Sequence, residues 1–159
     1  MKNPPNVFDF DKVSKLIDIY RTIDKAKGPG VCVTVSTSPK IFSAGFDLNY
    51  WMKDANINPL VSSNKLHELL STIITLHMPS LCLINGHAYG GGLILSLCHT
   101  YRAMVEDKAK LCLSEINLGF TLGPALTVLC KDKMPINSFR EMLLGIAYKG
   151  PRAKEMGVV

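Results

Sequence analysis

The fold of this chain is decided by the stretch Leu81-Cys-Leu-Ile-Asn-Gly-His-Ala-Tyr-Gly-Gly-Gly-Leu-Ile-Leu-Ser-Leu-Cys98. Its first four residues predict a short buried strand, and the glycines at 90–92 precede an apolar helix. Glycine loses more backbone freedom on folding than any other residue, so three in a row indicate a special requirement. One interpretation is a helix N-terminus whose unpaired N–H groups face an oxygen that carries or develops negative charge. The other is tight packing of helix on strand that leaves room only for glycine. These residues alone support the two interpretations equally.

The composition is that of one globular domain over residues 1–159, with 47% hydrophobic and 19% charged residues. No apolar run is long enough to span a membrane, and neither end carries a recognisable targeting signal. The five cysteines show no paired spacing, which predicts buried reduced thiols and an intracellular protein. The net charge of +5 comes from dispersed lysines. This is a weak indication of an anionic ligand, and without a basic-aromatic cluster it speaks against nucleic acid as a partner.

The remaining chain predicts alternating helices and strands, and therefore the α/β class. Residues 3–10 are expected to be extended, and Asp11 to cap the helix that follows. The β-branched run 31–35 predicts a buried parallel strand, and the aperiodic residues 49–59 a mobile loop at the mouth of a site. Further elements are expected as a helix through Leu66 to His77, strands at 101–105 and 110–113, a helix from Pro124 and a last helix over 139–147.

Chemistry is expected at two places besides the glycine run. Glu115 follows a predicted strand among apolar residues, and partial desolvation would raise its pKa toward the range of a general base. Capping of the next turn is the alternative, and composition alone favours it. The turn at Ala44-Gly45 could present the Phe46 N–H to a ligand, although a tight turn capped by Asp47 is favoured from the residues alone. The four histidines, at 67, 77, 87 and 99, show no spacing for a metal site. The glycine spacing excludes a dinucleotide fingerprint and a phosphate loop.

Three segments taken together resemble the crotonase (enoyl-CoA hydratase/isomerase) superfamily: Phe42-Ser-Ala-Gly-Phe-Asp-Leu48, Ile84-Asn-Gly-His-Ala-Tyr-Gly-Gly-Gly92 and Ser114-Glu-Ile-Asn-Leu-Gly119. The resemblance implies a spiral of ββα units, usually trimeric, that binds acyl-CoA thioesters. It implies an oxyanion hole made by the backbone N–H groups of Phe46 and Gly91. No metal and no cofactor besides the coenzyme A of the substrate is implied. The other residues assigned to substrate binding flank the two N–H groups: Ser43, Ala44, Gly45, Asp47, Leu48, Gly90 and Gly92.

The acidic residues point to one branch of that superfamily. Its hydratases typically carry one glutamate shortly after the triple glycine and a second at the position of Glu115. Here the first position is Ile94, which cannot activate water. A single later glutamate resembles the Δ3,Δ2-enoyl-CoA isomerases of the plant-type peroxisomal branch. That implies proton transfer from C2 to C4 of a 3-enoyl thioester by Glu115, within fatty acid β-oxidation.

Compared with the family pattern, the sequence lacks the usual first strands and the C-terminal helices that cover the acyl pocket. The alternative function is therefore a non-catalytic protein that binds acyl-CoA or assembles with related chains, and a hydratase ranks third. A homotrimer or a hetero-assembly is expected. The resemblance implies a peroxisomal or mitochondrial location. Residues 49–65 are expected to shape the acyl pocket.

Overall fold

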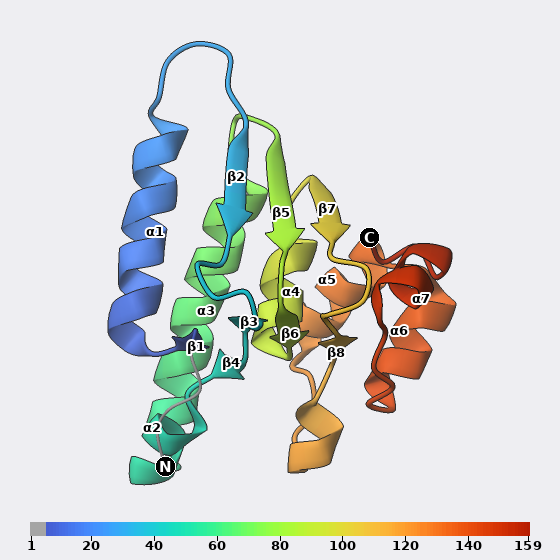
Figure 1. Ribbon diagram of the computed structural model, residues 1–159. Helices are drawn as coiled ribbons and strands as arrows, with labels where there is room; N and C mark the ends of the chain where they lie inside the picture. Colours follow the sequence, from blue (N-terminus) through green and yellow to red (C-terminus); the bar gives the residue numbers. More distant parts are fainter. Residues whose placement is uncertain (1–5) are drawn as a thin grey trace.

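The structure, a computed structural model, describes residues 6–159 and contains three parallel sheets (Figure 1). The first sheet has the order β2-β5-β7 and consists of Cys32–Val35, Ser80–Ile84 and Tyr101–Met104. The second has the order β3-β6-β8 and consists of Ile41–Ser43, His87–Tyr89 and Leu111–Cys112. The third pairs β1 (Val7–Phe8) with β4 (Gly45–Phe46).

The chain passes three times from the first sheet to the second and then into helical structure. The first passage leads to α2 (Leu48–Lys53) and α3 (Asn58–Ile74), and the second leads to α4 (Gly91–Leu97). The third leads to η1 (Glu115–Leu118) and α5 (Pro124–Lys133). This confirms the predicted spiral of ββα units. The three passages differ in length, which explains why the sequence shows no repeat of fixed period.

Helices cover both ends of this spiral (Figure 1). At one end α1 (Phe10–Asp24) packs on α3, where Arg21 and Glu68 form an ion pair of 3.0 Å. At the other end lie α6 (Ile136–Leu143) and α7 (Gly150–Glu155), joined to β8 through an antiparallel bridge between Tyr148 and Leu111. The predicted cap of α1 is wrong by two residues. Asp9, not Asp11, accepts the Lys12 N–H at 2.7 Å.

Several other predictions need correction. The strand β2 is not buried as a whole: Val33 and Val35 are 49% and 54% exposed, whereas Cys32 is buried. Residues 49–59 lie mostly in α2 and in the start of α3 instead of a loop, because Asp47 caps α2 and Pro59 occupies the first turn of α3. The predicted helices to His77 and over 139–147 end earlier, at Ile74 and Leu143. Of the segment 3–10, residues 3–5 lie outside the described part, and α1 already begins at residue 10.

The core is continuous and centres on α4, in which every residue is buried. Side chains from α1, α3, β5, β8, α5 and α6 surround it, among them Ile17, Leu66, Leu69, Ile73, Ile84, Leu111 and Met142. All five cysteines are buried and unpaired, as predicted. No helix within residues 6–159 is long and apolar enough to cross a bilayer. Because packing holds α4 on all sides, its N-terminal glycines occupy a fixed place.

Candidate active site

The turn after β3 is held by side-chain hydrogen bonds at both of its ends. The Ser43 hydroxyl donates to the Asn6 carbonyl at 2.8 Å and accepts the Gly45 N–H at 3.2 Å. At the far end, the Asp47 N–H donates to the Phe8 carbonyl at 3.3 Å. Successive N–H groups of an extended segment point to opposite sides, so the Phe46 N–H points away from β1. The Asp47 carboxylate accepts the N–H groups of residues 49 and 50 and begins α2.

The glycine run lies directly against this turn. A Cβ added at Gly45 would lie 3.0 Å from the Tyr89 carbonyl oxygen and 3.1 Å from the Gly91 nitrogen. Gly91 is the first residue of α4, where the N–H has no intrahelical acceptor. A Cβ at Gly92 would lie 2.5 Å from the Ser43 carbonyl oxygen. The two interpretations of the run therefore apply to different glycines: close packing explains Gly92, and an N–H without an intrahelical partner is a property of Gly91.

Glu115 lies against the glycine run and belongs to the segment that follows β8, the third passage of the chain. It is the first residue of η1, three residues after the end of β8, and a Cβ at Gly90 would lie 2.8 Å from its Oε1 atom. Its Oε2 atom is buried and has no hydrogen-bond partner within residues 6–159. Burial raises the pKa of this carboxyl above its usual value, as the sequence predicted. The N-cap residue of η1 is Ser114, whose side chain makes no capping hydrogen bond, and Glu115 lies in the first turn.

These three segments enclose a cavity of about 340 Å³. Seven of the predicted site residues line it: Ala44, Gly45, Phe46, Leu48, Gly90, Gly91 and Glu115. Ser43, Asp47 and Gly92 do not line it but hold the turns that do. Ile94 lines the cavity one turn into α4, and among residues 6–159 Glu115 is its single acidic side chain. The cavity thus combines one desolvated carboxyl with two adjoining turns whose N–H groups lie at its wall.

Comparison with known proteins places this arrangement in a family. The chain matches the enoyl-CoA hydratase/isomerase family over residues 1–159. It belongs to that family. Among its relatives, "Enoyl-CoA delta isomerase 2, peroxisomal" of Arabidopsis thaliana is 28% identical over 96% of this chain, and "Enoyl-CoA delta isomerase 1, peroxisomal" of the same plant is 33% identical over 94%. The chain spans 66% and 62% of the lengths of these two relatives. The solved structure of Pseudomonas aeruginosa DspI matches with a TM-score of 0.88 at 24% identity, covering 98% of this chain and 60% of that one. This last likeness confirms the crotonase-like fold.

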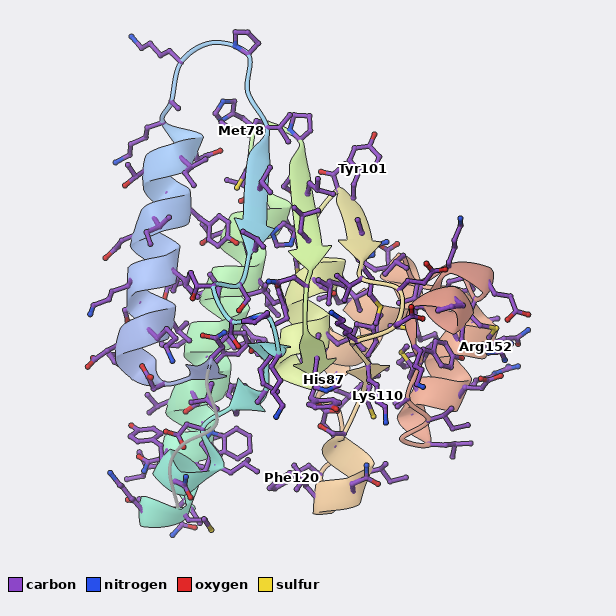
Figure 2. The ribbon with its side chains drawn as sticks, viewed as in Figure 1. Met78, His87, Tyr101, Lys110, Phe120 and Arg152 are labelled. Atoms are coloured by element: carbon purple, nitrogen blue, oxygen red, sulfur yellow. The ribbon has the colours of Figure 1, made fainter. Side chains whose placement is uncertain are left out.

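The segment 49–65, which was expected to shape the pocket, contributes Trp51, Pro59 and Ser63 to the cavity wall, although none of these side chains was singled out from the sequence. Trp51 packs on Phe46 with ring centroids 4.7 Å apart and meets the edge of Phe120 at 5.5 Å. Figure 2 shows Phe120 projecting from the segment that follows η1. Ser63 and His67 line the cavity from α3. Their spacing of four residues, continuing from Pro59, is the signal that could have found this helix face.

The other histidines lie outside the cavity. His87, which lies on β6 (Figure 2), stacks on Tyr89 with centroids 5.5 Å apart, and its buried Nδ1 atom has no partner within residues 6–159. His99 follows α4, accepts from the Thr34 hydroxyl at 2.8 Å and lies against Tyr20. Among the described residues no three His, Cys, Asp or Glu side chains are arranged to hold a metal ion. Glu115 and His67 are thus the ionisable side chains that this cavity offers to a ligand.

Proposed function

We propose that this family member is a Δ3,Δ2-enoyl-CoA isomerase, which moves the double bond of a 3-enoyl thioester to the 2-trans position. The observation that carries the proposal is the single carboxyl of the cavity, Glu115, beside two turns that bear the N–H groups of Phe46 and Gly91. The isomerase names of the two relatives support the same reaction. Because the chain spans less than two thirds of those proteins, its activity needs its own test.

In the proposed reaction Glu115 removes a proton from C2 of the substrate. The electrons of the broken C–H bond form a double bond between C1 and C2, and the carbonyl π electrons move onto the thioester oxygen, which carries the negative charge of the dienolate while the C3–C4 double bond is still in place. Hydrogen bonds from Phe46 and Gly91 to that oxygen stabilise the charge, each contributing on the order of a hundred- to a thousandfold in rate. The protonated Glu115 then returns the proton to C4, and the double bond comes to rest between C2 and C3.

The environment of Glu115 suits a group that must both accept and donate one proton. Burial raises its pKa, which brings the carboxyl closer to the pH at which the reaction runs. Hydration would need a second group to deliver water, and at the position where family hydratases carry their first glutamate the cavity has Ile94. An aliphatic side chain there favours isomerisation over hydration.

We propose an acyl-CoA thioester as substrate, a step of fatty acid β-oxidation as the context, and no cofactor beyond the coenzyme A of the substrate. Both relatives are named as peroxisomal proteins, and this favours the peroxisome over the mitochondrion. A trimer, or an assembly with related chains, is the proposed state, and sedimentation of the purified protein measures it.

The deciding experiment follows conversion of a 3-enoyl-CoA to its 2-enoyl isomer by the purified protein and by Glu115→Gln. The substitution removes the base and preserves shape, so the rate is expected to fall at least about a hundredfold. Glu106→Gln is the matched control, because Glu106 is exposed in a turn away from the cavity. Turnover that survives Glu115→Gln would refute the role of Glu115. Release of 3-hydroxyacyl-CoA from a 2-enoyl-CoA would identify a hydratase instead, and binding without turnover would identify a non-catalytic acyl-CoA-binding protein.

A further inference from the structure

Two polar side chains on the α3 wall of the cavity are unused by the proposed reaction. Ser63 and His67 both line the cavity, one helical turn apart. Neither side chain makes a hydrogen bond or ion pair with any residue of the described range 6–159. Residues spaced by four on a helix have β carbons about 5–6 Å apart, so both side chains can reach one ligand group. Both offer a donor, a hydroxyl from Ser63 and a ring N–H from His67.

The wall around this pair is apolar. It is formed by aromatic and aliphatic side chains, namely Trp51, Ile94, Leu118, Phe120, Leu122 and Leu126. An acyl chain in the cavity would contact these residues along its length. Ser63 and His67 belong to α3, whereas Glu115 belongs to η1, so the pair and the candidate base lie on different elements of the cavity wall. The two donors are therefore available to a part of the ligand other than the carbon that loses its proton.

We propose that Ser63 and His67 bind the far end of the acyl chain and select enoyl thioesters whose chain ends in a carboxylate. One carboxylate oxygen accepts from the Ser63 hydroxyl and the other from the His67 ring N–H. His67 is exposed on its outer side, so a charged chain end can remain partly hydrated there. This limits the desolvation cost that a fully buried carboxylate would carry. The inference rests on the proposed function for the reaction, but its binding step can be measured separately.

The probe for binding is built into the protein, because Trp51 is its single tryptophan and lines the cavity. Trp51 fluorescence is titrated with hexanoyl-CoA and with the adipoyl-CoA of equal chain length, two unreactive ligands that differ only at the chain end. The wild type is expected to bind the carboxylate-ended ligand about three- to tenfold more tightly, as one or two partly exposed hydrogen bonds provide. His67→Leu with Ser63→Ala removes both donors and is expected to abolish this preference, whereas His67→Gln keeps a donor and retains part of it. Asn64→Ala, an exposed neighbour outside the cavity, is the control.

Turnover of the matching pair of 3-enoyl substrates separates this inference from the proposed function. Equal affinities in the wild type, or a preference that survives the double substitution, would overturn the inference. Isomerisation of both substrates without a preference would leave the proposed function standing alone. Preferential binding without isomerisation would leave the inference standing and refute the isomerase. Failure to bind either ligand would count against both.

Discussion

Gly92→Ala tests whether the glycine run is required by packing. Alanine keeps the backbone N–H and favours a helix by about 1 kcal/mol over glycine, so local propensity alone predicts stabilisation. The structure instead predicts that Gly92→Ala lowers the stability of the protein. The new Cβ would lie 2.5 Å from the Ser43 carbonyl oxygen and 2.8 Å from the Ser43 Cβ. This backbone cannot rotate away, because the Ser43 hydroxyl is bonded to the Asn6 carbonyl.

The magnitude follows from that overlap. Overpacking costs about 1–3 kcal/mol, and for a contact of 2.5 Å we expect the upper end of that range, which leaves a net loss in unfolding free energy of about 2 kcal/mol after the gain in helix propensity. For a chain of this length that corresponds to a fall of roughly 4–8 °C in Tm. An ordinary contact begins at 3.4 Å, so the start of α4 must move by about 1 Å. A misplacement of about 1 Å at a reacting group can cost on the order of a hundredfold in rate, and Gly91, the proposed oxyanion donor, is the adjacent residue.

Urea unfolding and the isomerase assay together measure this prediction. Gly30→Ala is the matched control, because Gly30 has no positive φ and a Cβ there would lie 3.9 Å from the Met78 sulfur, an ordinary contact. Its effect on stability is expected to stay within about 0.5 kcal/mol. If Gly92→Ala proves as stable and as active as the wild type, close packing does not explain the glycine, and the donor role alone must account for the run.

Three further substitutions test the buried polar groups. Glu115→Gln is expected to be more stable than the wild type near pH 8. Burial raises the pKa of Glu115 in the folded state, so the ionised carboxyl destabilises that state. The difference in stability shrinks as the pH falls toward about 4, where the wild-type carboxyl is protonated. Thr34→Val is expected to cost about 1–3 kcal/mol, because the Thr34 hydroxyl bonds both Tyr20 at 2.6 Å and His99 at 2.8 Å. Burial lowers the pKa of His99 from 6.5 to about 4, so the unfolding free energy of the wild type declines as the pH falls through that interval. In His99→Gln this decline is expected to be smaller.

Chemical denaturation across a pH series measures all three effects. For Thr34→Val the control is Thr75→Val, whose exposed hydroxyl bonds only backbone carbonyls of its own helix and should change stability by less than about 0.5 kcal/mol. A stability gap between Glu115→Gln and wild type that does not change with pH would contradict the raised pKa. An unchanged acid slope in His99→Gln would show that other groups, such as the carboxylates that acquire ion pairs on folding, govern acid unfolding.

The sequence predicted best those elements that bury most of their apolar residues, above all α4. The strand β5 and helix α4 were predicted from continuous apolar runs, and both lie in the core. Helix α2 was missed because it has no buried residue, so its sequence carries no apolar periodicity to detect. The prediction for β2 was wrong in the opposite sense, because burial was predicted where the structure has exposure. Its apolar run predicted burial on both faces, but within residues 6–159 nothing covers Val33 and Val35.

The candidate site required long-range information that sequence patterns do not contain. The residues predicted for it were drawn from a resemblance, whereas the register of one small sheet explains why they meet. Pairing of Tyr89 with Cys112 in β6 and β8 allows the Gly90 N–H to donate to the Cys112 carbonyl at 2.9 Å, and this places Glu115 at the start of α4. Pairing of Ser43 with Ala88 in β3 and β6 places the other turn on the opposite side of the same glycines.

The three strands are parallel, so the segments that follow them emerge at one end of the sheet, as the crevices of parallel α/β proteins require. A shift of one residue in either register would reverse which side chains face the cavity. The glycine run then serves two purposes that cannot be separated by sequence. Gly92 lets α4 start close enough to Ser43 for the register to hold, and that closeness brings the Gly91 N–H beside the turn of Phe46. Packing at Gly92 is therefore a condition for the proposed oxyanion hole, so the two initial interpretations of the run do not exclude each other.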